Sequence, residues 1–267
     1  MADVSNIAWT DSTANFWMGC FKISPGCAHC YAETLTVNRM GLDVWGPAST
    51  SRRQEVKSIW TNLRKWNRDA GRAGVRRRVF VMSLGDFFEP HRDADAIRPR
   101  AWDAMRETFW LDFQILTKRP DNIVPNLPAD WGDGWTNVWL GTSIESDAYV
   151  SRVDELRRVP ARTKFISAEP LLGPLPSLNL SGIDWVIVGG ESGSGYRPMD
   201  HAWAREIRDK CVSSGTAFFM KQSAAPRTEM GTYLIEPDES RWAWKQYPRT
   251  PFMPDGDFAQ PVLVGTK

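Results

Sequence analysis

Short, almost unbroken apolar runs alternate with amphipathic helical patterns along most of this 267-residue chain. Such runs suit strands of a parallel sheet that is covered on both faces. The helical patterns span residues 93–108, 146–158 and 202–213. The apolar runs span residues 79–83, 113–117, 138–142, 164–167, 185–188 and 217–220. This alternation predicts βαβ units, and therefore either a doubly wound α/β sheet or a (β/α) barrel.

Polar residues follow each of these runs. They are Asp86 and Glu89, then Lys118 and Arg119, then Ser143 and Glu145, then Glu169, then Gly189, Gly190, Glu191 and Ser192, and finally Lys221 and Gln222. In barrels the active site is built from loops at the carboxyl ends of the strands. Any single hydrophilic loop is ordinary, but polar groups at six strand ends indicate one site. The two glycines permit either a tight turn or a close backbone approach to a ligand.

Three of the four cysteines fall within eleven residues, in a C-x6-C-x2-C spacing that contains a Pro-Gly turn. The turn can bring the thiols of Cys20, Cys27 and Cys30 together. Such a cluster favours a metal site over isolated thiols. A zinc site would need a fourth ligand, with His29, His201 and Cys211 as candidates. A [4Fe–4S] cluster could instead leave its fourth iron open for a substrate or cofactor.

Charge is segregated along the chain. The whole sequence has 33 Lys and Arg against 32 Asp and Glu, a net charge of +1. Residues 50–80 alone hold ten basic and two acidic side chains, a local charge of +8, which leaves about −7 for the remainder. This segment predicts contacts with a phosphate backbone, with two nearby tryptophans, Trp60 and Trp66, to pack or stack. The predicted contact residues are Arg52, Arg53, Arg64 and Arg68. The alternative is a solvated helix face without a partner.

The sequence also predicts where the protein resides and how it is divided. No apolar run approaches the ~20 residues of a membrane span, and residues 1–6 lack a signal pattern, so we expect no membrane partner and a cytoplasmic location. Disulfides are disfavoured in that reducing compartment. We expect residues 1–222 to form the barrel, and residues 223–267, rich in Pro, Gly and aromatic residues, to form an irregular extension over it.

Several longer motifs carry a family resemblance. They are Trp9-Thr10-Asp11, Gly19-Cys20, Ser24-Pro25-Gly26-Cys27-x-x-Cys30-Tyr31-Ala32-Glu33, LTKRP at 116–120, SAEPLLG at 167–173, DWVIVGGESG at 184–193 and FFxKQ at 218–222. Over residues 7–222 the chain resembles the phage- and prophage-associated three-cysteine-motif family. The architecture of that family is similar to that of radical S-adenosylmethionine (SAM) enzymes, including the spore photoproduct lyase type.

The resemblance implies an incomplete (β/α) TIM-like barrel of the radical SAM type. Cys20, Cys27 and Cys30 would bind a [4Fe–4S] cluster whose open iron is chelated by SAM. The residues implied to contact the cofactor are Asp86, Lys118, Ser143, Glu145, Glu169, Gly189, Gly190 and Glu191. Two features depart from the usual pattern: the cysteine loop is three residues longer than C-x3-C-x2-C, and Ser83-Leu84-Gly85-Asp86 replaces a Gly-Gly-Glu motif.

The function that these features imply is a radical SAM lyase or transferase that repairs or modifies a base of DNA or RNA. A base in a duplex would have to be extruded to reach a buried site. Such an enzyme needs an external electron donor, and a partner protein is compatible with the sequence. The alternatives are a zinc- or cluster-stabilised nucleic-acid-binding protein without catalysis, and radical chemistry on a small molecule or peptide.

Overall fold

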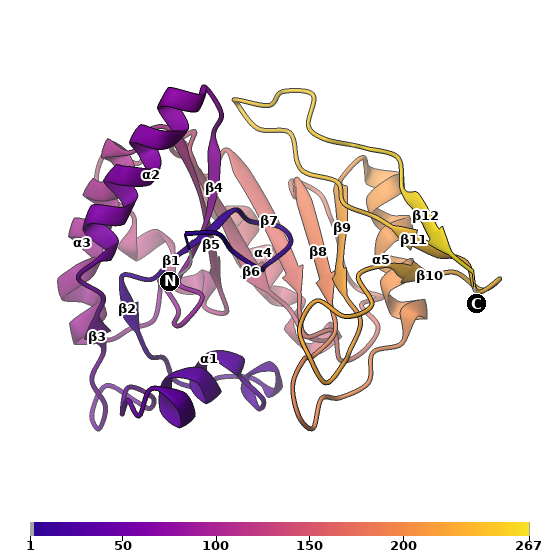
Figure 1. Ribbon diagram of the computed structural model, residues 1–267, viewed down its shortest axis with the longest axis horizontal. Coiled ribbons are helices and arrows are strands. Elements are labelled where there is room, and N and C mark those ends of the chain that lie inside the picture. Colours follow the sequence, from indigo (N-terminus) through magenta and orange to yellow (C-terminus); the bar gives the residue numbers. More distant parts are fainter. Residues whose placement is uncertain (1–2, 267) are drawn as a thin grey trace.

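A seven-stranded parallel sheet forms the centre of the computed structural model, which describes residues 3–266. Its strand order is β1-β4-β5-β6-β7-β8-β9, so every crossover moves in one direction, as in a (β/α) barrel. The strands are β1 Ser12–Ala14, β4 Arg77–Val81, β5 Leu111–Thr117, β6 Val138–Ser143, β7 Thr163–Ala168, β8 Trp185–Gly189 and β9 Ala217–Gln222. Strands β1 and β9 stay at the two edges (Figure 1). The predicted α/β class and incomplete (β/α) TIM-like barrel are confirmed.

The apolar runs arise because both faces of the sheet are buried. Successive side chains of a strand point to opposite faces. In β4, Val79 and Val81 belong to the large core that also includes the helices, while Phe80 belongs to a separate cluster with Trp139 and Trp185. Apolar residues are therefore needed at consecutive positions of each strand, which is why periodicity identified these strands from the sequence.

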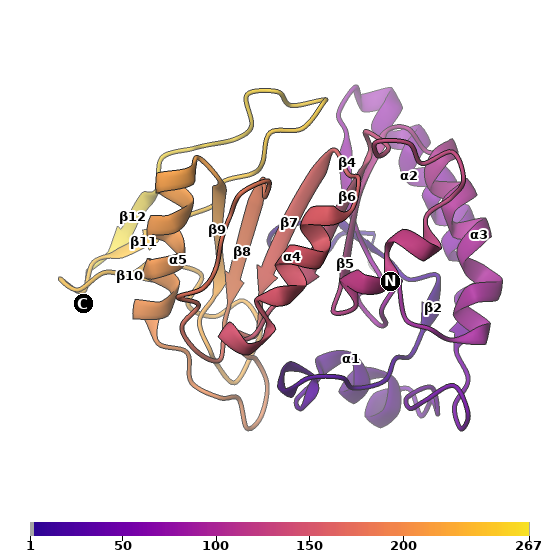
Figure 2. The same cartoon turned by 180° about the vertical axis from the view of Figure 1, so that it is seen from behind.

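Helices flank the sheet, and the four longest pack against it (Figures 1 and 2). These are α2 Ile59–Ala73, α3 Arg92–Glu107, α4 Ser151–Arg158 and α5 His201–Ser214. The shorter helices are η1 Pro25–Cys27, α1 Tyr31–Glu33, η2 Thr34–Arg39, η3 Pro120–Asn122, η4 Val124–Asn126 and η5 Asp147–Tyr149. Helix α4 begins later than predicted because the Asp147 carboxylate bonds to Ser177, and a separate 3-10 turn forms there.

Segments from the two ends of the sequence cover the inner face of the open barrel. The Trp9 ring lies 4.6 Å from Phe80 and 6.1 Å from Trp185. Tyr247, from the C-terminal extension, lies 5.4 Å from Trp185, and its hydroxyl donates to the carbonyl of Ala8. Figure 1 shows the N-terminal segment crossing in front of the sheet. These segments complete the interior that a closed barrel would fill with its own strands.

The C-terminal extension contains regular structure. Strands β10 Leu234–Ile235, β11 Arg241–Ala243 and β12 Val262–Gly265 form a small antiparallel sheet, and β2 Trp17–Met18 pairs with β3 Gln54–Glu55 near the N-terminus. The segment between β11 and β12 bonds to β9: the Trp244 carbonyl accepts from the Met220 amide, and the Gln246 amide donates to the Phe218 carbonyl. These bonds satisfy backbone groups on the free side of β9, which would otherwise be an exposed sheet edge. Within residues 3–266, no helix is long and apolar enough to cross a membrane.

The basic segment is largely neutralised in three dimensions. Its ion pairs join Arg52 to Asp93, Arg53 to Glu89, Lys65 to Asp3, Arg68 to Asp69, Arg76 to Asp112 and Arg78 to Asp11. Most of these acidic partners lie outside residues 50–80, so the charge asymmetry of the sequence is reduced in the fold. Of the two roles expected for Trp60 and Trp66, packing is the one observed, because both side chains are buried.

Arg53 has a structural position that the sequence did not reveal. Its side chain has no exposed surface and forms a bidentate pair with Glu89, with Nε–Oε1 and Nη2–Oε2 distances of 2.7 and 2.9 Å. It also donates to the carbonyls of Val44 and Gly46. The prediction that Arg53 contacts nucleic acid is corrected, because this guanidinium is enclosed and fully engaged.

The other three predicted contact residues remain exposed. They are Arg52, Arg64 and Arg68. Arg52 and Arg68 form exposed ion pairs with Asp93 and Asp69, and contact of these arginines with nucleic acid stays a prediction.

Replacing Arg53 by Gln should lower the free energy of unfolding by about 3–5 kcal/mol, because Glu89 would remain as a buried, unpaired carboxylate. The matched variant Arg52→Gln alters an exposed pair and should change stability by less than about 1 kcal/mol. Urea unfolding of both variants measures the difference. Equal effects of the two substitutions would contradict the enclosed position of Arg53.

Candidate functional site

The cysteine loop and the polar strand ends line one cavity of about 270 Å³. Residues predicted for the site that line it are Cys20, Cys27, Cys30, Asp86, Lys118, Ser143, Glu169, Gly190 and Glu191. Parallel strands bring their carboxyl ends to one edge, so residues far apart in the sequence meet there. Two predicted residues, Glu145 and Gly189, are not part of this lining.

The cysteine loop lies across the carboxyl ends of the strands. Figure 1 shows α1, which follows this loop, below the sheet. The loop leaves β2, turns through η1 at Pro25–Cys27 and ends at Cys30, which caps the start of α1. All three thiols are free and half-buried. Their convergence on one cavity follows from the Pro-Gly turn that the sequence contains.

The protein environment disfavours the thiolate forms of Cys20 and Cys30. Burial raises the pKa of Cys20 strongly, and the carboxylates of Asp86 and Glu89 add to this, while Arg119 opposes it. Burial also raises the pKa of Cys30. Thiolates at these positions need added positive charge, which a bound metal supplies.

Asp86, predicted to contact the cofactor, is held within the protein. Its carboxylate accepts from the Thr117 hydroxyl at 2.6 Å and pairs with the Arg119 guanidinium at 2.8 Å. Arg119 also donates to the carbonyl of Phe21 and lies 3.6 Å from the Cys20 sulfur. The pair therefore links the ends of β4 and β5 to the first cysteine.

Glu145, which follows β6, anchors the cysteine loop to the sheet. Its fully buried carboxylate accepts from the Ser24 hydroxyl at 2.6 Å and from Arg152 at 2.9 Å. A Cβ atom on Gly26 would lie only 2.4 Å from Glu145, so the loop can approach this closely only with glycine at that position. The expected cofactor contact at Glu145 is thus replaced by a contact with the loop itself.

Glu191 joins the end of β8 to the same loop. Its carboxylate bonds to His29 Nδ1 at 2.9 Å and pairs with Arg197, which also donates to the carbonyl of Pro25. Burial acts to raise the pKa of Glu191, but the hydrogen bonds from Arg197 and His29 outweigh it and hold the pKa at about 2. Glu191 is therefore ionised at neutral pH, and it lines the same cavity as the cysteines.

The remaining predicted residues serve different purposes. Glu169, at the end of β7, forms an ion pair with Lys221 of β9. A Cβ atom on Gly190 would lie 2.1 Å from the Ala224 nitrogen, so the close approach expected there involves the chain's own backbone. Lys118 lines the cavity and forms a long ion pair with Glu145, with the two charged atoms 3.8 Å apart.

The three thiols fit an iron–sulfur cluster better than they fit most single metal ions. In residues 3–266, no three His, Cys, Asp or Glu side chains are already arranged around a metal position. Three thiols nevertheless line one cavity, and soft thiolates are the usual ligands of such clusters. Cys211 lies in the core, and both ring nitrogens of His201 are occupied by Ser223 and Ile235. Of the proposed fourth zinc ligands, only His29 lines the cavity.

Some residues of the site escaped prediction. Arg152 and Arg197, which neutralise Glu145 and Glu191, lie six or seven residues beyond them in the sequence, and nothing in a single sequence identifies such partners. Glu229 lines the cavity from the C-terminal extension, outside the strand pattern. Only tertiary structure brings these three to the site.

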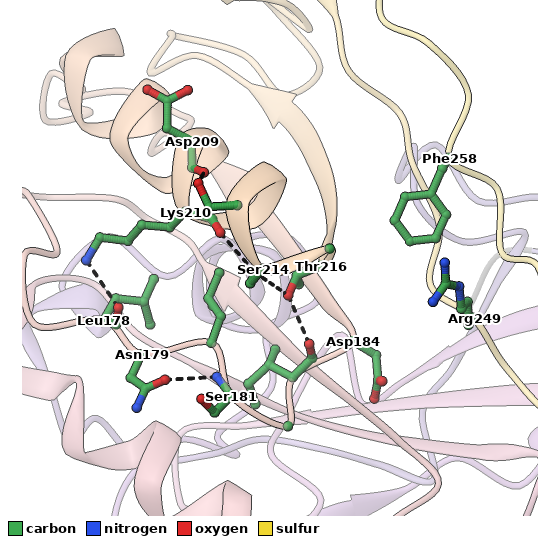
Figure 3. Close-up of a pocket in the computed structure, with 15 residues that line it drawn as sticks. Leu178, Asn179, Ser181, Asp184, Asp209, Lys210, Ser214, Thr216, Arg249 and Phe258 are labelled. Atoms are coloured by element: carbon green, nitrogen blue, oxygen red, sulfur yellow. Dashed lines mark hydrogen bonds between the residues drawn. The ribbon is translucent and has the colours of Figure 1, made fainter.

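A larger hollow of about 850 Å³ lies elsewhere, between the β7–β8 connection, the end of α5 and the C-terminal segment (Figure 3). Its polar groups bond to one another: Lys210 donates to the Leu178 carbonyl, and the hydroxyls of Ser214 and Thr216 are 2.8 Å apart. None of the residues predicted for the site lines this hollow. The candidate site is therefore the smaller cavity.

Replacing Glu145 by Ala should loosen the cysteine loop, because Ser24 loses a charge-assisted hydrogen bond. We expect amide hydrogen exchange over residues 20–30 to accelerate roughly tenfold. Glu155→Ala, on the exposed side of α4, is the matched control and should leave that exchange unchanged. Unaltered protection of the loop in Glu145→Ala would contradict the anchoring role.

The low pKa of Glu191 predicts a pH dependence of stability. Its folded value of about 2 lies below the ordinary 4.5, so its contribution is complete above pH 4.5 and is lost as the pH falls towards 2. The stability difference between the wild-type protein and Glu191→Gln should therefore shrink over that interval. Denaturant unfolding at several pH values tests this, and a constant difference would refute it.

Comparison with known proteins places the chain in a family. Residues 4–242 match the model of a family described as proteins of unknown function, DUF5131. No curated protein matches the chain significantly. Two variants of spore photoproduct lyase have similar structures, with a TM-score of 0.43, 13% and 12% sequence identity, and coverage of 87% of this chain and 65% of theirs. The chain thus spans just under two thirds of those proteins. Because the family model covers most of the sequence, this protein belongs to the DUF5131 family.

Proposed function

We propose that this protein is a radical SAM-type enzyme that binds a [4Fe–4S] cluster through Cys20, Cys27 and Cys30. The observation that carries the proposal is that three free thiols on one loop line the same cavity as the polar carboxyl ends of the parallel strands. Neither Cys211 nor His201 reaches this cavity, which favours a ligand set of three thiolates and an open fourth iron.

When bound at the open iron, SAM would supply a 5′-deoxyadenosyl radical. The chain's own residues would hold the loop and orient the bound groups. Arg119 fixes the loop beside Cys20, and Glu145 fixes it at Ser24. Lys118 is positioned to neutralise a carboxylate at the cavity wall, and Ser143 offers a hydroxyl there.

We propose a base of DNA or RNA as the substrate, with an external electron donor. The exposed side chains of Arg52, Arg64 and Arg68 support contact with a phosphate backbone. Since the thiols lie in a cavity, a base would have to leave its stack to approach them. The cytoplasmic location and the association with phages stay predictions from the sequence.

The cofactor is tested by anaerobic purification followed by iron, sulfide and zinc analysis. We expect a brown protein that cleaves SAM to 5′-deoxyadenosine on reduction. Cys27→Ala should lose the cluster and this cleavage, because two thiolates cannot hold it. Cys211→Ala is the matched control, since that thiol is buried in the core, and it should retain its iron.

A mononuclear zinc site is the second candidate, and one contact favours it. His29 Nδ1 bonds to Glu191, the arrangement by which carboxylates orient zinc-binding histidines. A colourless protein that holds one zinc and loses it in His29→Ala would establish this site and overturn the proposed cluster.

A further inference from the structure

The cavity has a second wall that the cysteine loop does not form. It combines residues that precede β1, including Trp9, with Glu229 from the loop after β9 and the Glu169–Lys221 ion pair. Phe80 contributes an aromatic side chain to the same wall. This wall thus combines charged groups with two largely buried aromatic rings, which are tilted by 58° to each other.

Glu229 is the unusual member of this wall. Burial raises the pKa of its carboxyl group, against the opposing influence of Lys221 and Lys245. The backbone of Ala8 bonds to the carboxylate, yet no cation within residues 3–266 forms an ion pair with it. A carboxylate offers about four acceptor positions, so most of its hydrogen-bonding capacity remains unused.

The backbone at Glu229 is held in an unfavourable conformation. Its φ of 58° lies in the left-handed region, which is costly for residues other than glycine. The side-chain oxygen of Gln222, fully buried at the end of β9, accepts from the Glu229 amide at 2.8 Å. A buried side chain thus fixes this loop residue at the cavity.

Lys221 completes the donor and acceptor pattern. Its ammonium group has three N–H donors, of which Glu169 accepts one, and the residue lines the cavity. The wall therefore has a donor at Lys221 and acceptors at Glu229 and Glu169. A ligand would complement this pattern if one edge carried an acceptor for Lys221 beside a donor for Glu229 or Glu169.

We propose that Glu229, Glu169 and Lys221 form a subsite for the amide- or amidine-like edge of a nucleobase, with its ring against Trp9 and Phe80. The nucleobase assignment rests on the proposed function, whereas the residues and their polarity come from the cavity itself. The indole Nε1 of Trp9, a residue that is 2% exposed, has no hydrogen-bond partner among the described residues.

The test is equilibrium binding of thymidine, deoxycytidine, deoxyadenosine and deoxyguanosine to the full chain by calorimetry. We expect at least one nucleoside to bind, and Glu229→Gln to weaken it about tenfold through loss of a charged acceptor. Glu206→Gln, at an exposed position of α5, is the matched control and should bind as the wild-type protein does. Glu169→Gln provides a second variant, and thermal unfolding verifies that each variant is folded.

Absence of nucleoside binding to the wild-type protein, or equal binding by folded Glu229→Gln, overturns the subsite. Iron and sulfide are measured on the same samples. A protein that carries the cluster and binds no nucleoside refutes this inference alone, whereas nucleoside binding by a protein without iron refutes the proposed cofactor alone.

Discussion

The pairing of carboxylates with cations at the strand ends is the interaction on which the candidate site depends. Buried carboxylates without partners would take up protons or destabilise the fold. The same cations also hold the cysteine loop, because Arg119 donates to the Phe21 carbonyl and Arg197 to that of Pro25. The pairs are Asp86–Arg119, Glu145–Arg152, Glu169–Lys221 and Glu191–Arg197. The same side chains thus neutralise the carboxylates at the strand ends and position the loop that carries the thiols.

The sheet was predictable because the apolar pattern of each strand lies within a short stretch of the sequence. Six of its seven strands were identified from apolar runs, since burial on both faces requires apolar residues at successive positions. Strand β1 escaped detection because Ser12–Ala14 is short and two of its three residues are polar. The small sheet of the C-terminal extension escaped as well, because its strands of two to four residues carry too little periodicity.

The sequence predicted where the site lies better than it predicted what each of its residues contacts. The strand-end rule brought Asp86 and Glu191 to the cysteine cavity, but charge counted along the sequence could not reveal which partner each residue meets. Arg53 is the clearest example: within a run of arginines it resembled a phosphate contact, yet Glu89, 36 residues away, encloses it. Glu145 likewise bonds to a loop 121 residues earlier.

The contacts at Ala8 have a consequence for the order of assembly. This residue bonds to Glu229 and to Tyr247, so the inner wall joins an early part of the chain to a late one. A ribosome that has synthesised all seven strands has still not supplied the segment that closes this wall. The inner wall around Ala8 can therefore close only after Tyr247 has been synthesised, late in translation.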